Sequence, residues 1–191
     1  MKYIGILGGT FNPIHIGHLA MAQTAFERLK LDSVIFVPSY LPPHKSSQNV
    51  IDAKHRYAMV KSAIKGNPSF TLSDFEIKRK SKSYSIDTLE HFHKVYPQGT
   101  KFYFIIGEDS LETLPKWKRI EDLLKLVSFV VVNRVGTTFK KSKLNVHSLI
   151  MPTLEISSSF IRKKISLGES IRYWVPEKVY QYIQNHKLYR I

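Results

Sequence analysis

Two glycines and two histidines lie close together near the start of the chain, where residues 8–18 read GGTFNPIHIGH. Paired glycines let a backbone turn tightly and approach a ligand closely. His15 and His18 are three residues apart at the entry to a predicted helix, so they can face the same side. A helix start favours an anion, and two imidazoles there suit phosphate groups that gain charge in a transition state. The segment therefore predicts a phosphate site. The alternatives are a surface turn or part of a metal site, and no third ligand cluster is evident to complete a metal site.

A second run of polar residues lies near the other end, where residues 156–162 read ISSSFIR. Three hydroxyls at a helix start can cap the helix or bind phosphate oxygens. Arg162, about one turn later, can return to the same phosphate as a planar donor. Alone, this run favours an ordinary helix cap with a surface arginine. Paired with residues 8–18, it favours a second phosphate-binding element.

Short apolar strands alternate with amphipathic helices along the chain. The expected strands are 2–7, 33–37, 70–72, 75–77, 102–106, 128–132 and 146–150, and the expected helices are 17–30, 53–65, 87–95, 120–126, 157–167 and 177–185. This alternation predicts an α/β fold, a Rossmann-like doubly wound parallel sheet. Loops 8–14, 38–45, 107–117 and 133–138 follow strands, and ligands of such sheets bind at the carboxyl ends of the strands.

The composition is that of a globular protein of 191 residues, 43% of them hydrophobic. We expect a single domain over residues 1–191, with a C-terminal helical part from about residue 157. The chain has no cysteine, which excludes a disulfide framework, a zinc–thiolate site and a cysteine nucleophile. No signal peptide or bilayer-spanning apolar stretch is visible, so we expect a cytoplasmic protein without a membrane partner.

The formal net charge of +14 favours polyanionic partners. Nucleic acid, an anionic membrane surface and phosphorylated small molecules all fit that charge, and composition alone does not choose between them. The basic clusters at 78–82 and 140–143 are short and lack interleaved aromatic residues, which makes a single-strand binding platform a weaker interpretation.

The sequence HIGH at residues 15–18 resembles the HxGH signature of the nucleotidyltransferase superfamily, which also includes class I aminoacyl-tRNA synthetases. Residues 8–19 are similar to the corresponding stretch of bacterial nicotinate-nucleotide adenylyltransferases, and the resemblance runs from residue 2 to about 165. It implies a nucleotidyltransferase-type fold in which His15 and His18 contact ATP phosphates and stabilise the pentavalent α-phosphorus. Residues 156–162 resemble the ISSTxIR motif that grips the β- and γ-phosphates, with Ser159 in place of threonine.

The resemblance implies two sets of site residues, and Mg²⁺ accompanying ATP. Its catalytic groups are His15, His18, Lys45 and Arg162. Its ATP site comprises Gly8, Gly9, Thr10, Phe11, His15, His18, Gly107, Asp109, Ile156, Ser157, Ser158 and Arg162. In this set Asp109 accepts hydrogen bonds from a ribose, while Glu108 departs from the small residue more usual beside it.

The mononucleotide site implied by the resemblance comprises Asn12, His44, Tyr84, Ser85, Trp117 and Arg134. His44 belongs to a Pro-Pro-His-Lys loop, and Tyr84 and Ser85 to a segment that presents amides and a hydroxyl to the nicotinate carboxylate. Trp117 would stack on the pyridine ring and Arg134 would bind the mononucleotide phosphate. The plainer alternatives are a solvated turn, a helix cap, a core tryptophan and a surface arginine.

The implied function is transfer of AMP from ATP to nicotinate mononucleotide, giving nicotinate adenine dinucleotide and pyrophosphate in NAD biosynthesis. Adenylyltransferases acting on phosphopantetheine or nicotinamide mononucleotide share the HxGH site and remain alternatives. A class I synthetase is disfavoured because 191 residues leave no room for an anticodon domain. A nucleic-acid-binding protein is less favoured and predicts steeply salt-dependent oligonucleotide binding. The sequence leaves a homo-oligomer open.

Overall fold

A parallel sheet forms the centre of the molecule in the computed structural model, which describes residues 1–42, 50–134, 146–152 and 154–190. Within these residues the sheet has six strands in the order β3-β2-β1-β4-β5-β6, all parallel to their neighbours. The strands are β1 (Tyr3–Gly9), β2 (Ser33–Pro38), β3 (Phe70–Leu72), β4 (Lys101–Gly107), β5 (Ser128–Arg134) and β6 (His147–Met151). The chain order reverses between β1 and β4, which is where a doubly wound sheet binds its ligand.

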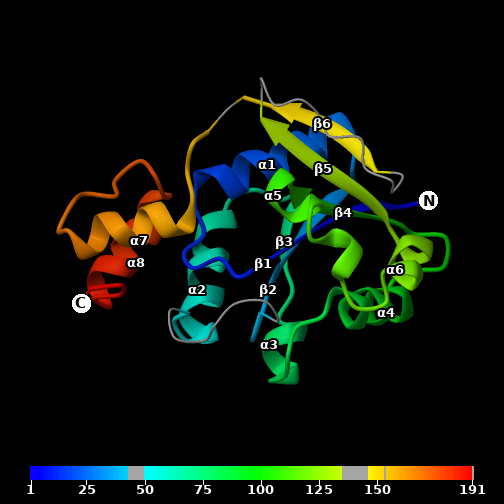
Figure 1. The fold of residues 1–191 in the computed structure, drawn as a ribbon, viewed down its shortest axis with the longest axis horizontal. Coiled ribbons are helices and arrows are strands. Elements are labelled where there is room, and N and C mark those ends of the chain that lie inside the picture. The colour runs from blue at the N-terminus through cyan, green and yellow to red at the C-terminus, as the bar shows by residue number, and fades with distance from the viewer. Residues whose placement is uncertain (43–49, 135–145, 153, 191) are drawn as a thin grey trace.

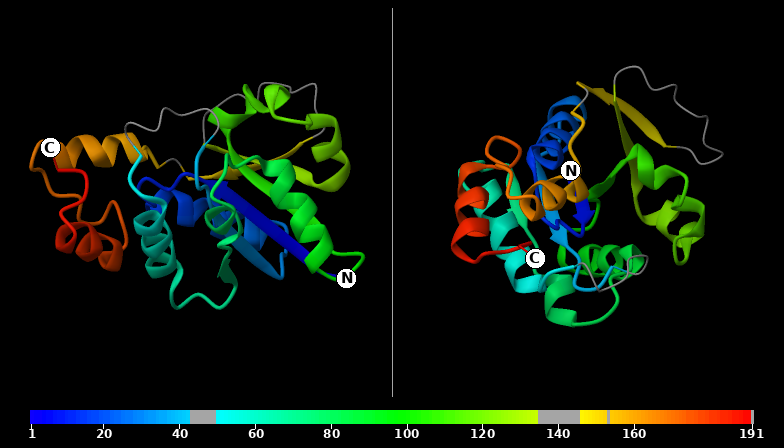
Figure 2. Two further views of the ribbon diagram at one scale, coloured as in Figure 1. Left: turned by 90° about the horizontal axis from the view of Figure 1, so that it is seen from below. Right: turned by 60° about the vertical axis from the view of Figure 1, so that its left-hand side comes forward.

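Helices connect the strands and cover the sheet (Figures 1 and 2). They are α1 (Ile16–Arg28), α2 (Ala53–Ile64), α3 (Phe75–Arg79), α4 (Ser85–Val95), α5 (Glu108–Leu111), η2 (Leu114–Lys116), α6 (Ile120–Leu126), α7 (Ser158–Ser166) and α8 (Glu177–Asn185). Figure 1 shows α7 and α8 on the side of the molecule that carries α2, and α4 and α6 on the opposite side. The predicted α/β class and doubly wound architecture are confirmed.

Successive strand residues point to opposite faces of the sheet and divide the core in two. In β2, Val34 and Phe36 belong to the cluster that also includes residues of α1, α2, α7 and α8. Ile35 and Val37 belong to the cluster that includes residues of α4 and α6. Because strands buried on both faces are apolar at every position, they were recognisable in the sequence.

Two predicted elements are wrong. Residues 75–77, predicted as a strand, begin the helix α3, because the Ser73 hydroxyl accepts the Phe75 N–H at 3.3 Å and supports a helix start. The stretch 107–117, predicted as a loop, contains α5 and η2. An apolar run of three residues does not distinguish strand from helix, and one-turn helices leave no periodic pattern.

The remaining predicted elements are present with ends shifted by a few residues, as for α4, which begins at Ser85 and not at Asp87. Among the described residues, no helix is long and apolar enough to cross a membrane.

Candidate active site

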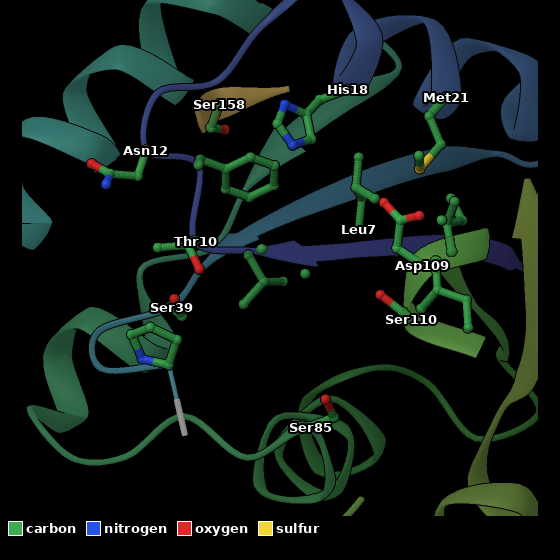
Figure 3. A pocket seen from close by; sticks show the side chains of 18 of the residues that line it. Leu7, Thr10, Asn12, His18, Met21, Ser39, Ser85, Asp109, Ser110 and Ser158 are labelled. Carbon is green, nitrogen blue, oxygen red and sulfur yellow. The ribbon is translucent and has the colours of Figure 1, made fainter. Parts of the chain in front are cut away.

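A cavity of about 1020 Å³ opens at the carboxyl ends of β1 and β4, at the reversal of strand order. Its walls come from the β1–α1 loop and α1, from the start of α4, from α5 and Trp117, and from the start of α7. Figure 3 shows His18 and Ser158 close together in this pocket, with Asp109 and Ser110 on another side and Ser85 apart from both groups. Segments distant in sequence therefore share one space.

His18 is oriented by the backbone of its own helix start. Its Nδ1 accepts the backbone N–H of His15 at 3.2 Å, so the neutral ring carries its proton on Nε2. The Phe11 ring meets the His18 ring edge-on at 5.1 Å between centroids. Phe11 is buried and stands at φ 48°, in the left-handed region, which turns the chain under the imidazole. This hydrogen bond thus orients the ring and makes Nε2 its donor nitrogen.

His15 lies deeper than His18, and its ring centroid is 3.7 Å from that of His18. Burial lowers the pKa of His15 to about 4, and its Nδ1 has no hydrogen-bond partner among the described residues. A Cβ at Gly17 would lie 3.1 Å from the His15 Nδ1. The space beside Gly17 is therefore filled by the His15 ring.

The start of α7 meets the β1–α1 loop directly. The Ser157 hydroxyl accepts the Phe160 N–H and caps the helix. The Ser158 hydroxyl donates to the Pro13 carbonyl at 2.9 Å, and the Arg162 Nη1 donates to the Asn12 carbonyl at 2.9 Å. The two phosphate-binding elements predicted from sequence are therefore joined by hydrogen bonds, and Arg162 reaches the same cavity as His18.

All residues predicted to bind ATP line this one cavity. They are Gly8, Gly9, Thr10, Phe11, His15, His18, Gly107, Asp109, Ile156, Ser157, Ser158 and Arg162. Asp109 is exposed and reaches the pocket from α5 (Figure 3). Within the described part of the chain, no group of three or more potential ligands is arranged to hold a metal ion.

Of the residues predicted to bind the mononucleotide, Asn12, Tyr84, Ser85 and Trp117 line the same cavity. The Asn12 Oδ1 accepts hydrogen bonds from the Ile51 N–H and the Tyr189 hydroxyl, so that atom also ties together three parts of the chain. His44 and Lys45 lie outside the described residues. Arg134 ends β5, and its side chain is likewise outside them.

Trp117 is both a core residue and a cavity wall. Its ring packs edge-on against Phe104 at 5.7 Å and Phe129 at 6.1 Å between centroids. It remains partly exposed and lines the pocket. The two interpretations weighed from sequence, core and ring-stacking surface, are therefore compatible.

Sequence reasoning missed Glu76, a buried carboxyl of α3 that lines the cavity. Its Oε1 accepts the Thr88 hydroxyl at 2.6 Å, and burial raises the pKa of its carboxyl. Arg56 was also missed, although it is fully buried. The available signal was its spacing, since Arg56 stands on the same helical face as the buried residues Met59 and Val60.

Comparison with known proteins agrees with this geometry. Residues 6–164 match the cytidylyltransferase-like family model. A relative from Oceanobacillus iheyensis, named "Probable nicotinate-nucleotide adenylyltransferase", is 44% identical, with 99% of this chain and 97% of the relative aligned. A relative of the same name from Clostridium tetani is 43% identical over 100% of both chains.

The chain belongs to the nicotinate-nucleotide adenylyltransferase family.

Solved structures agree on the fold. The nicotinic acid mononucleotide adenylyltransferase of Plasmodium falciparum, in complex with NaAD, superposes with a TM-score of 0.83 at 23% identity over 99% of this chain and 98% of the other. The same enzyme with APC gives a TM-score of 0.81 at 21% identity over the same shares. The family assignment rests on the sequence relatives, and these structures support the architecture alone.

Proposed function

We propose that this chain transfers the AMP moiety of ATP to nicotinate mononucleotide, as the names of its relatives indicate. The phosphate oxygen of the mononucleotide forms a bond to the α-phosphorus, and the bond from that phosphorus to the bridging oxygen breaks. The products are nicotinate adenine dinucleotide and pyrophosphate. The observation that carries the proposal is the single cavity containing His18, Ser158, Ser85 and Trp117.

The triphosphate occupies the side of the cavity formed by the β1–α1 loop and the start of α7. The His18 Nε2 proton and the Arg162 guanidinium stabilise charge on the phosphates as the bond to the leaving pyrophosphate breaks. Because the attacking phosphate is already an anion at neutral pH, no general base is needed. Catalysis is then positioning with charge stabilisation, as in other phosphoryl transfers.

The acceptor occupies the side formed by Trp117 and the start of α4. Trp117 stacks on the pyridine ring. Ser85 is the first residue of α4, and a helix start favours the nicotinate carboxylate over a neutral amide. Lys118 Nζ lies 4.4 Å from the centre of the Tyr84 ring, which adds positive charge beside this region. A site built for a buried anion discriminates strongly against a neutral analogue.

Mg²⁺ enters with ATP, since magnesium usually binds one or two carboxylates together with substrate phosphates. The carboxylate of Glu108 lines the cavity and would be such a ligand, while Asp109 keeps its role toward the ribose. When bound, the ion supplies charge neutralisation on the triphosphate. The resemblance assigns a catalytic role to Lys45 and mononucleotide binding to His44 and Arg134, and these roles complete the proposal.

The test is a product assay with ATP, Mg²⁺ and four separate acceptors: nicotinate mononucleotide, nicotinamide mononucleotide, phosphopantetheine and FMN. We expect pyrophosphate release and dinucleotide formation with nicotinate mononucleotide, and much slower turnover with the nicotinamide analogue. A greater kcat/KM with phosphopantetheine, FMN or nicotinamide mononucleotide would refute the assigned acceptor. Release of pyrophosphate with none of the four would refute the activity itself.

A further inference from the structure

Arg56 is the largest side chain that the fold buries completely among the described residues. It belongs to α2 and does not line the cavity. Its three nitrogens each donate one hydrogen bond to a backbone carbonyl: Nη1 to Thr10 at 2.7 Å, Nη2 to Tyr40 at 2.9 Å, and Nε to Ile51 at 3.0 Å. One guanidinium therefore binds the loop after β1, the loop after β2 and the residues just before α2.

Two of those carbonyls belong to the loops that leave β1 and β2, and the third precedes α2. Thr10 is in the segment that lines the triphosphate side of the cavity. Tyr40 accepts Arg56 on its carbonyl, and its N–H donates to the Ser83 hydroxyl at 2.9 Å. Ser83 directly precedes Tyr84 and Ser85 on the acceptor side. Hydrogen bonds thus link Thr10 through Arg56 and Tyr40 to Ser83, two residues before α4 begins.

Burial of this side chain has a cost, because moving a cation out of water costs several kcal/mol. The three carbonyl contacts offset part of it, because a buried carbonyl left without its donor costs about 1–3 kcal/mol. Among the described residues, no carboxylate lies within ion-pair distance of Arg56. The planar guanidinium fixes the relative positions of the several acceptors that it binds. A lysine ammonium has no such fixed geometry.

We propose that Arg56 is a positioning residue for the adenylyl transfer, because it holds the Thr10 and Tyr40 backbones, and with them the two substrate-binding sides of the cavity, at one fixed spacing. This rests on the proposed function. Arg56 touches neither substrate, so it acts through the loops. Without the Arg56 guanidinium, the triphosphate side still binds ATP and the acceptor side still binds the mononucleotide. The attacking oxygen and the α-phosphorus are then misaligned.

The test compares Arg56→Lys and Arg56→Met with the parent, at low temperature and per folded molecule as judged by circular dichroism. A small misplacement of reacting groups costs about 100-fold in rate. We expect kcat to fall by about that factor in both variants, while KM for ATP and for nicotinate mononucleotide stays within about threefold. The lysine variant should not rescue turnover, because it restores charge and not geometry.

Met59→Ala is the matched control. Met59 is a fully buried residue of the same helix and its truncation leaves a cavity in the core. We expect it to lower the melting temperature while kcat at low temperature stays within about twofold of the parent, because the loop contacts of Arg56 remain.

Four results overturn the proposal: a parent-like kcat in Arg56→Lys, a KM increase that accounts for the whole loss, an equal loss of kcat in Met59→Ala, or unfolding of both Arg56 variants at low temperature. Unfolding would make Arg56 a requirement of the fold and not of the site. If the parent itself forms no dinucleotide, the proposed function is at fault and not the role of Arg56.

Discussion

The triphosphate side and the acceptor side of the cavity are built in different ways. On the triphosphate side, polar groups are held by backbone: His18 accepts an N–H, and Ser158 and Arg162 donate to carbonyls of the β1–α1 loop. On the acceptor side, Trp117 is held by aromatic packing against Phe104 and Phe129. The triphosphate side is arranged to stabilise negative charge, and the acceptor side is arranged to stack against a flat ring.

This difference predicts different kinetic effects. Groups that meet charge developing at the α-phosphorus act mainly in the transition state, so their loss lowers kcat. The Trp117 ring contacts the acceptor equally in the ground state and in the transition state, so its loss raises KM for the acceptor.

His18→Ala should have the largest effect. Removing one preorganised donor to a developing oxyanion costs about 10²- to 10³-fold in kcat. KM for both substrates should change little, and thermal unfolding should be close to that of the parent because His18 is only partly buried. His93→Ala, at an exposed histidine of α4, is the control and should retain normal turnover. Near-normal kcat in His18→Ala would contradict the role of this imidazole.

Trp117→Ala should raise KM for nicotinate mononucleotide by about tenfold, as expected for a lost stacking contact worth about 1–2 kcal/mol. KM for ATP should change much less. Because Trp117 also packs on Phe104 and Phe129, the variant should melt at a lower temperature, so assays belong well below that melting point. Equal KM changes for both substrates would remove the distinction between the two sides.

The low pKa of His15, about 4, predicts a loss of stability in acid. Below an ordinary histidine pKa of about 6.5, the unfolded chain takes up a proton that the folded chain does not, until the pH reaches about 4. The contribution of His15 to the unfolding free energy should fall by about 1 kcal/mol between about pH 7.5 and about pH 5.5. Above that window it contributes no pH dependence.

Urea unfolding of the parent and of His15→Gln at the two pH values measures this term. The difference in unfolding free energy between the two proteins should change with pH by the stated amount. Parallel pH dependences in parent and variant would show that His15 titrates normally in the folded protein.

Ser158→Ala should have the smallest effect. Its hydroxyl donates to Pro13 and links α7 to the β1–α1 loop, and such a hydrogen bond contributes about 1 kcal/mol. Because residues 156–162 are expected to hold the β- and γ-phosphates and not the reacting α-phosphorus, we expect KM for ATP to rise by about threefold to fivefold with kcat nearly unchanged. Ser166→Ala, at the far end of the same helix, should leave both constants unchanged. An increase in KM for nicotinate mononucleotide alone would contradict the placement of Ser158 on the triphosphate side.

The sequence revealed the triphosphate side because its chemistry is contiguous. Residues 8–18 and residues 156–162 each contain a turn or helix start together with polar side chains, so each segment can be recognised by itself in the sequence. Buried strands were equally legible from their apolar runs. The short helices α3, α5 and η2 were not, because they are too short for a period to show.

Arg56 and Glu76 could not be assigned from sequence because their partners are far away. Arg56 bonds to carbonyls at residues 10, 40 and 51, which carry no side-chain signal. Glu76 bonds to Thr88 across two helices. Only the tertiary structure shows that these buried polar groups are satisfied and adjoin the site. The single-domain organisation, cytoplasmic location and any homo-oligomer remain predictions from sequence.

The central claim, that Trp117 faces the acceptor while the His18 side faces ATP, is tested most directly by tryptophan fluorescence. The chain has two tryptophans, so Trp174→Phe leaves Trp117 as the sole reporter. We predict saturable quenching by nicotinate mononucleotide, with a Kd near its KM, and little change with ATP alone. The contradictory result is that ATP quenches the Trp117 fluorescence of an active Trp174→Phe variant while nicotinate mononucleotide does not change it.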